Sequence, residues 1–176
     1  MKTIVCTILS LFMFTTVCGQ KIVTNEVDKF TGCKFVETSV IKTFDPDVDY
    51  KLCALNDTLY ISAYTKNQSI QVKEKAQAKL YILIGKDNPI ILQGVVRNAQ
   101  QHEHHSGVHW GFGISTGKTR TLTDLEFLYL VPNDVFVLLC SNNITDIRIS
   151  INDDNIDYHA DGFIAKKFRK LFNLMK

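Results

Sequence analysis

The chain has 176 residues, of which 45% are hydrophobic and 22% are charged, and its formal net charge is +2. Such a balance lacks the basic excess that is typical of nucleic-acid binding, so it argues against a dedicated nucleic-acid-binding protein. Only three prolines occur, and no Gly/Ser-rich stretch interrupts the chain. The composition therefore predicts one globular domain without an internal linker.

Residues 1–19 have the organisation of a secretory signal peptide. A basic start precedes the mainly apolar run 4–17, and a small residue precedes Gln20. This pattern predicts cleavage before Gln20 and export to the periplasm, the cell envelope or the extracellular space. One alternative is a lipoprotein with its lipid on Cys18, although lipidation signals prefer a smaller residue than Val17 before the cysteine. The other is a retained anchor, although the apolar run is shorter than the roughly 20 residues that span a bilayer.

Cleavage would leave a single β-rich domain, residues 20–176, with no transmembrane segment. Three cysteines stay in this domain, and an odd number leaves at least one thiol unpaired. Cys140 lies in an apolar run, which predicts a buried thiol. Cys33 and Cys53 would pair in an oxidising compartment only if their strands are neighbours, so the disulfide state stays open.

Period-two alternation of apolar and polar residues is the main structural signal, and it predicts half-buried strands. Turn-forming residues at 85–89 and 152–155 separate some of these segments. Short strands joined by turns predict an α+β fold with a mostly antiparallel sheet or sandwich of about seven to nine strands. The clearest alternating segments are 59–64, 79–84, 124–129 and 146–151.

Two segments have helical character. Residues 133–140 fit a helix that starts at Asn133, but their β-branched and aromatic residues also suit a strand. Residues 162–175 carry one apolar stripe at helical spacing, with basic residues on the other side and Asp161 as the N-cap. We expect this second helix to cover the apolar face of the sheet. The alternative is that its basic side lies on an anionic membrane.

Two sets of short motifs resemble a known group. Asp28-Lys29-Phe30-Thr31-Gly32 is followed by Glu37-Thr38-Ser39, and Tyr129-Leu130-Val131-Pro132 by Ile144-Thr145-Asp146-Ile147-Arg148-Ile149. Over roughly residues 25–175, the chain resembles uncharacterised exported proteins of Bacteroidetes-type bacteria, a domain of unknown function. The resemblance implies a bacterial envelope location and a helix at 133–140, but no reaction. The chain departs from the group's pattern at Cys33 and in its His-rich segment.

Four of the five histidines lie within eight residues, in a segment that we interpret as a polar loop. Neutral imidazole binds zinc or copper, so a metal site is one hypothesis and a solvated loop is the other. In an extended chain, alternate residues share a face, which would place His102 with His104 and Glu103 with His105. The zinc-protease pattern His-Glu-x-x-His fails because residue 106 is serine. The candidate metal ligands are His102, Glu103, His104, His105 and His109.

No recognisable set of catalytic residues accompanies this segment. Residues 113–117 have the letters of a nucleophile elbow but not its strand–turn–helix context. The sequence therefore favours a non-enzymatic exported binding or structural envelope protein with an unidentified protein or glycan partner. The alternative is a zinc- or copper-binding protein, or an enzyme, that uses residues 102–109.

Overall fold

The computed structural model describes residues 19–176, apart from residues 45 and 111–113, with backbone alone at 105–110 and 114–118. The signal-peptide prediction for 1–18, and with it the lipidation alternative at Cys18, lies outside the described residues. These residues form ten strands and two helices. In chain order they are β1 (Ile22–Val27), β2 (Lys34–Thr38), β3 (Ile41–Lys42), β4 (Val48–Leu55), β5 (Thr58–Gln68), β6 (Gln77–Leu83), β7 (Ile90–Trp110), β8 (Ile114–Val131), α2 (Asn133–Ser141), β9 (Asp146–Ile151), β10 (Asp154–His159) and α3 (Gly162–Asn173).

The strands form one sheet in the order β1-β2-β4-β5-β8-β7-β6-β9-β10, and the short β3 pairs with β4. Every strand pair is antiparallel. The predicted α+β class with a mostly antiparallel sheet is confirmed. The structure has ten strands where about seven to nine were expected, because β3 is too short to give an alternating pattern.

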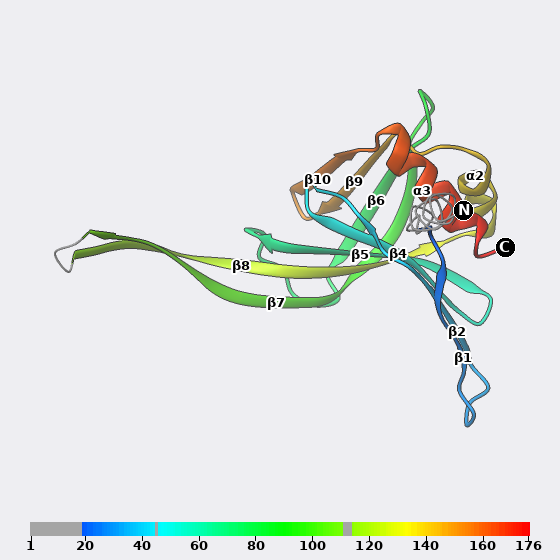
Figure 1. Ribbon diagram of the computed structural model, residues 1–176, viewed down its shortest axis with the longest axis horizontal. Helices are drawn as coiled ribbons and strands as arrows, with labels where there is room; N and C mark the ends of the chain where they lie inside the picture. Colours follow the sequence, from blue (N-terminus) through cyan, green and yellow to red (C-terminus); the bar gives the residue numbers. More distant parts are fainter. Residues whose placement is uncertain (1–18, 45, 111–113) are drawn as a thin grey trace, which may run out of the picture.

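One face of the sheet forms the core together with α2 and α3. Ile147, Ile149 and Ile151 are nearly fully buried on this face, as their alternation predicts. The sheet curves around α3 (Figure 1), so strands far apart in the sheet order face one another across the core. Accordingly, burial and the nearby Tyr158 of β10 both raise the pKa of Tyr50 on β4.

Helix α3 covers the concave face, as the sequence predicts. The Asp161 carboxylate accepts hydrogen bonds from the backbone N–H groups of Phe163 and Ile164 at 2.9 and 2.8 Å, which confirms the predicted N-cap. The ring of Phe168 packs edge-on against Tyr50 with centroids 5.3 Å apart. Each large apolar side chain buried in this way contributes about 1.5–3 kcal/mol. The buried residues of the helix are Ile164, Ala165, Phe168, Leu171 and Phe172.

The shorter helix α2 agrees with the helix that the resemblance implies at 133–140, and it packs beside α3. Cys140 at its end is buried, as predicted. All three cysteines of the described residues are free. Register explains why Cys33 and Cys53 do not pair: Cys53 lies opposite Glu37, four residues and about 13 Å along the strand from Cys33.

The longest strands, β7 and β8, extend far beyond the body of the molecule (Figure 1). Pairing of β6 with β7 stops at Val95, and pairing of β5 with β8 stops at Thr123. Past these points β7 and β8 pair only with each other within the described residues, in register from His102–Leu122 to Trp110–Ile114. We call this two-stranded ribbon, residues 102–110 and 114–122, the arm.

The arm corrects one interpretation of the sequence. Residues 102–109 are not a loop but part of β7. The described side chains of this part, residues 102–104, are all exposed, so both faces are polar here and no buried side produces an alternating pattern. The partner strand carried the missed signal, because the β-branched Thr119, Thr121 and Thr123 recur at every second position.

No helix within the described residues combines the length and the apolar character needed to cross a bilayer.

Candidate functional site

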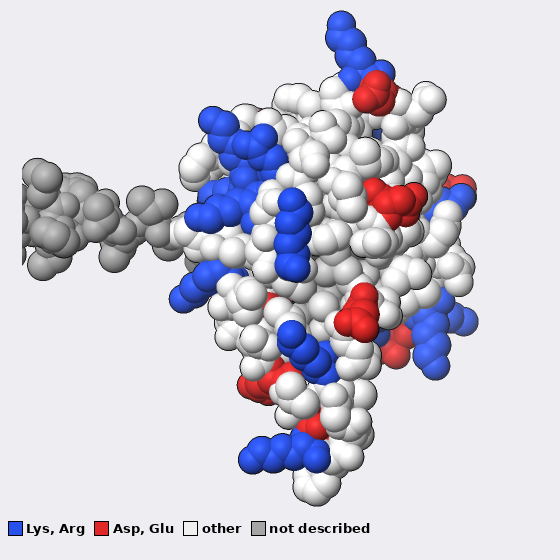
Figure 2. Space-filling view, turned by 90° about the vertical axis from the view of Figure 1, so that its right-hand side faces the viewer, with Lys and Arg blue, Asp and Glu red and all other residues white. Residues whose placement is uncertain are grey.

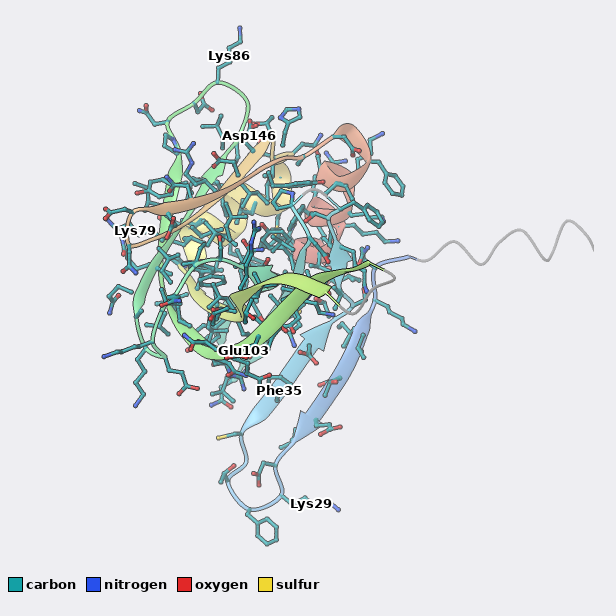
Figure 3. The ribbon with its side chains drawn as sticks, turned by 90° about the vertical axis from the view of Figure 1, so that its left-hand side faces the viewer. Lys29, Phe35, Lys79, Lys86, Glu103 and Asp146 are labelled. Carbon is teal, nitrogen blue, oxygen red and sulfur yellow. The ribbon has the colours of Figure 1, made fainter. Side chains whose placement is uncertain are left out.

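The histidines lie on the arm with the sidedness predicted for an extended chain. His102 is opposite Leu122 and His104 is opposite Arg120, so these two histidines belong to the convex face of the sheet. Glu103, opposite Thr121, belongs to the other face, and Figure 3 shows it on the ribbon viewed along the arm. The backbones of His105 and His109 lie further along β7, and their side chains are outside the described part.

A polar cluster joins three strands where the arm leaves the body. Its centre is the Asp124 carboxylate of β8, which is 22% exposed. It accepts hydrogen bonds from the Tyr64 hydroxyl at 3.1 Å and from the Asn67 backbone N–H at 3.0 Å. His102 Nε2 lies 3.0 Å from the Asn67 side-chain oxygen, and its Nδ1 lies 4.0 Å from Asp124 Oδ1. The cluster therefore anchors the arm to β5.

An irregularity in the backbone of β5 determines the position of Asn67. The pairing register of β5 with β8 shifts between Thr65 and Gln68, and Asn67 has φ 55°. Asparagine tolerates this left-handed conformation better than most residues. The shift turns the Asn67 N–H out of the ladder and toward the Asp124 carboxylate. A local bulge thus supplies one of the two donors that hold the carboxylate.

The cluster does not have the geometry of a catalytic set. Among the described residues, His102 has polar contacts only with Asn67 and Asp124, and 4.0 Å is too long for a hydrogen bond to the carboxylate. Burial, followed by the hydrogen bond with Asp124, raises the pKa of Tyr64. The Tyr64 hydroxyl therefore stays protonated as a donor and is a poor general base.

The described residues include no group of three or more His, Cys, Asp or Glu side chains arranged to hold a metal ion. His102 and His104 share a face, but the Nε2 of His102 is already bonded to Asn67. A metal bound through that nitrogen would have to break this contact. The zinc or copper site on residues 102–109 stays a prediction, because two of its five ligands lie outside the described side chains.

Beside the cluster, the convex face contains a hollow of about 300 Å³. Ser62 on its wall is 1% exposed, yet its hydroxyl has no hydrogen-bond partner among the described residues, and one oxygen of Asp49 also lacks one. Of its basic neighbours, Lys51 pairs with Glu37 at 2.6 Å and Arg97 pairs with Glu126 at 3.3 Å. The hollow thus presents unsatisfied acceptors. Its lining is Val40, Asp49, Lys51, Ser62, Tyr64 and Glu126.

A larger cavity of about 560 Å³ lies at the other end of the sheet, between the β1–β2 hairpin and the two helices. Its walls are apolar at Val36, Leu59 and Phe136 and solvated at Lys34 and Asp57. None of the buried polar atoms that lack a partner in the described chain lies in this lining. Size alone does not make it the better site, since specificity requires convergent polar groups.

Neither a protein-family model nor a curated protein matches this chain. The site must therefore be interpreted from its own geometry. The histidine-rich segment that the sequence singled out lies on β7 and contributes His102 to the cluster, but sequence reasoning missed Tyr64, Asn67 and Asp124. Sixty residues separate Tyr64 from Asp124. Only the polar positions of β5 and β8 that alternate with core residues could have suggested a polar convex face.

Proposed function

We propose that the chain is an exported, non-enzymatic binding domain that acts at the bacterial envelope or outside the cell and holds a protein partner along its arm. The observation that supports this proposal is the pairing of the arm. Beyond Val95 and Thr123, the outer edges of β7 and β8 have no strand partner among the described residues. The resemblance to exported proteins supports the compartment.

An isolated two-stranded ribbon is marginally stable in water, because it has no core of its own. The arm nevertheless continues as such a ribbon through nine residue pairs, from His102–Leu122 to Trp110–Ile114. Strands at the edge of a sheet present rows of backbone donors and acceptors, which an added strand from another protein can satisfy. A protein partner fits this feature better than a glycan, because a glycan does not continue a backbone ladder.

The hollow near the arm's root would contribute specificity. One Asp49 oxygen and the unpartnered Ser62 hydroxyl offer acceptors, whereas Lys51 is occupied by Glu37 and Glu126 is occupied by Arg97. A lysine or arginine side chain from the partner would satisfy them and would neutralise the Asp49 carboxylate. The proposed partner therefore presents an extended strand followed by a basic side chain.

The test removes the arm and keeps the cluster that anchors it. Residues 103–121 are replaced by Asn-Gly, which favours a tight hairpin turn between His102 and Leu122, an observed cross-strand pair. The core residues all lie outside the deleted segment. We therefore expect the melting temperature to change little.

Binding is measured by photo-crosslinking in the envelope fraction of the host. A photoreactive residue at His104 should give one discrete protein adduct, whereas the same residue at the exposed Lys86 should give none. In the arm-deleted variant, which no longer contains His104, the photoreactive residue is placed at the retained Gln100. This variant should give no adduct. An equal pattern of adducts from His104 and Lys86 would refute a role for the arm. Turnover in a broad hydrolase screen, abolished by one point substitution, would instead support the enzyme hypothesis.

A further inference from the structure

The outward side of α3 is basic and carries an exposed aromatic ring. Phe163 is 66% exposed, and the helix sequence contains four basic residues and no acidic one. Lys167 Nζ lies 4.2 Å from the centre of the Phe163 ring, so a cation and a ring are held side by side. We call Phe163, Lys166, Lys167, Arg169 and Lys170 the basic face. Figure 2 shows Lys and Arg side chains gathered on the side of the molecule that bears α2 and α3.

Residues next to the basic face are also basic or aromatic. Helix α3 packs against β3, where Lys42 is exposed. Two residues further on, Phe44 is 91% exposed. The nearest acidic group on the helix is the N-cap Asp161, whose carboxylate is engaged with backbone N–H groups. Exposed aromatic rings among basic side chains are the composition of surfaces that lie on anionic lipid.

The start of the described chain lies near the same side. Gln20 accepts a hydrogen bond from the Ser39 hydroxyl at 2.7 Å, and the Ser39 backbone N–H donates to Lys21 at 2.7 Å. Ser39 is two residues before β3, which packs on α3. The described chain thus begins close to β3 and to the helix that carries the basic face.

We propose that the basic face docks on the surface of an anionic lipid bilayer. The α3 stripe that packs on the sheet is buried, so the opposite, cationic side is the one available for docking. The arm leaves the body away from the end that carries α2 and α3 (Figure 1). A docked molecule would therefore extend its arm away from the membrane. This surface is separate from the arm, so it does not depend on the proposed function.

Co-sedimentation with lipid vesicles tests the proposal on the protein from Gln20 onward. Vesicles of phosphatidylcholine mixed with phosphatidylglycerol should bind the protein, and vesicles of phosphatidylcholine alone should not. Binding should weaken steeply as the salt concentration rises, because screening shortens the reach of exposed charges. Each lysine near an anionic surface strengthens binding about fivefold, the equivalent of roughly 1 kcal/mol.

The decisive variant is Lys166→Gln/Lys170→Gln, which should weaken binding about 25-fold if the two contributions add. Its matched control is Lys79→Gln/Lys86→Gln, which changes the net charge equally on β6 and on the β6–β7 turn (Figure 3). Glutamine keeps a similar helix propensity, so both variants should fold. A Phe163→Trp variant should show a blue shift of emission on binding, beyond that of the natural protein with its single Trp110.

Three outcomes would overturn the proposal. Equal binding by the two charge variants would show that the lipid contact does not lie on α3. Equal binding to both kinds of vesicle would show that binding does not require anionic lipid. Binding to heparin without binding to anionic vesicles would identify a soluble polyanion, rather than a bilayer, as the occupant of the basic face.

Discussion

Removing the Asp124 carboxylate should loosen the root of the arm and lower the free energy of unfolding. Asp124 is only 22% exposed and accepts hydrogen bonds from the Tyr64 hydroxyl and the Asn67 backbone. A hydrogen bond to a charged group contributes about 1.5–3 kcal/mol net, and partial exposure places these two near or below the lower limit. We therefore expect Asp124→Ala to cost about 2–3 kcal/mol and Tyr64→Phe about 1 kcal/mol.

A double-mutant cycle isolates the contact. Because Tyr64→Phe removes the same hydrogen bond, the double variant should be about 1 kcal/mol more stable than the sum of the two single effects predicts. Urea denaturation followed by circular dichroism measures all four proteins. The matched control is Asp157→Ala, which removes a carboxylate that is 59% exposed and bonded to Arg148. An exposed pair of this kind contributes less than about 1 kcal/mol.

Hydrogen exchange gives the local readout. In Asp124→Ala, the amides of residues 98–104 and 119–123 should exchange faster, whereas those of β9 and β10 should not change. Additive effects of Asp124→Ala and Tyr64→Phe would refute the argument. A loss from Asp124→Ala no larger than that from Asp157→Ala would do the same, because burial would then confer no extra strength on the Asp124 bonds.

Three other predictions concern packing, metal binding and acid. Gly94→Ala should destabilise the protein by about 3 kcal/mol or more in urea denaturation, because a Cβ at this position would lie 2.3 Å from the ring of the buried Tyr129. Little change in the free energy of unfolding would show that the strand can shift. Zinc or copper titrated calorimetrically should bind the natural protein more tightly than His102→Ala/His104→Ala, because the variant lacks two of the imidazole ligands. Equal, weak binding by both proteins would exclude the site. The hydrogen bond from His159, 2.7 Å away, lowers the pKa of Asp146. The stabilising effect of this hydrogen bond is therefore present above about pH 4 and is lost as the pH falls further. The difference in melting temperature between the natural protein and Asp146→Asn should shrink over that range.

The elements with one buried side were predictable from the sequence. Ile147, Ile149 and Ile151 on β9 and the apolar stripe of α3 both have a period that matches their structure, and Asp161 caps α3 as its position indicates. The arm was not predictable in this way, since hydrophobic periodicity exists only where one face is buried. The anchoring cluster was missed for a different reason. Tyr64 and Asp124 are brought together by the sheet order and by a bulge, neither of which leaves a local pattern.

The position of α3 in the chain has a consequence for how the protein reaches its folded state. All ten strands precede this helix in the sequence, yet Tyr50 on β4 completes its packing only against Phe168. Contacts between residues so far apart in sequence form slowly, because a long loop must close first. A chain still emerging from a ribosome or a translocation pore therefore has a sheet without its cover. The apolar face of such a chain stays exposed and needs protection until the helix arrives.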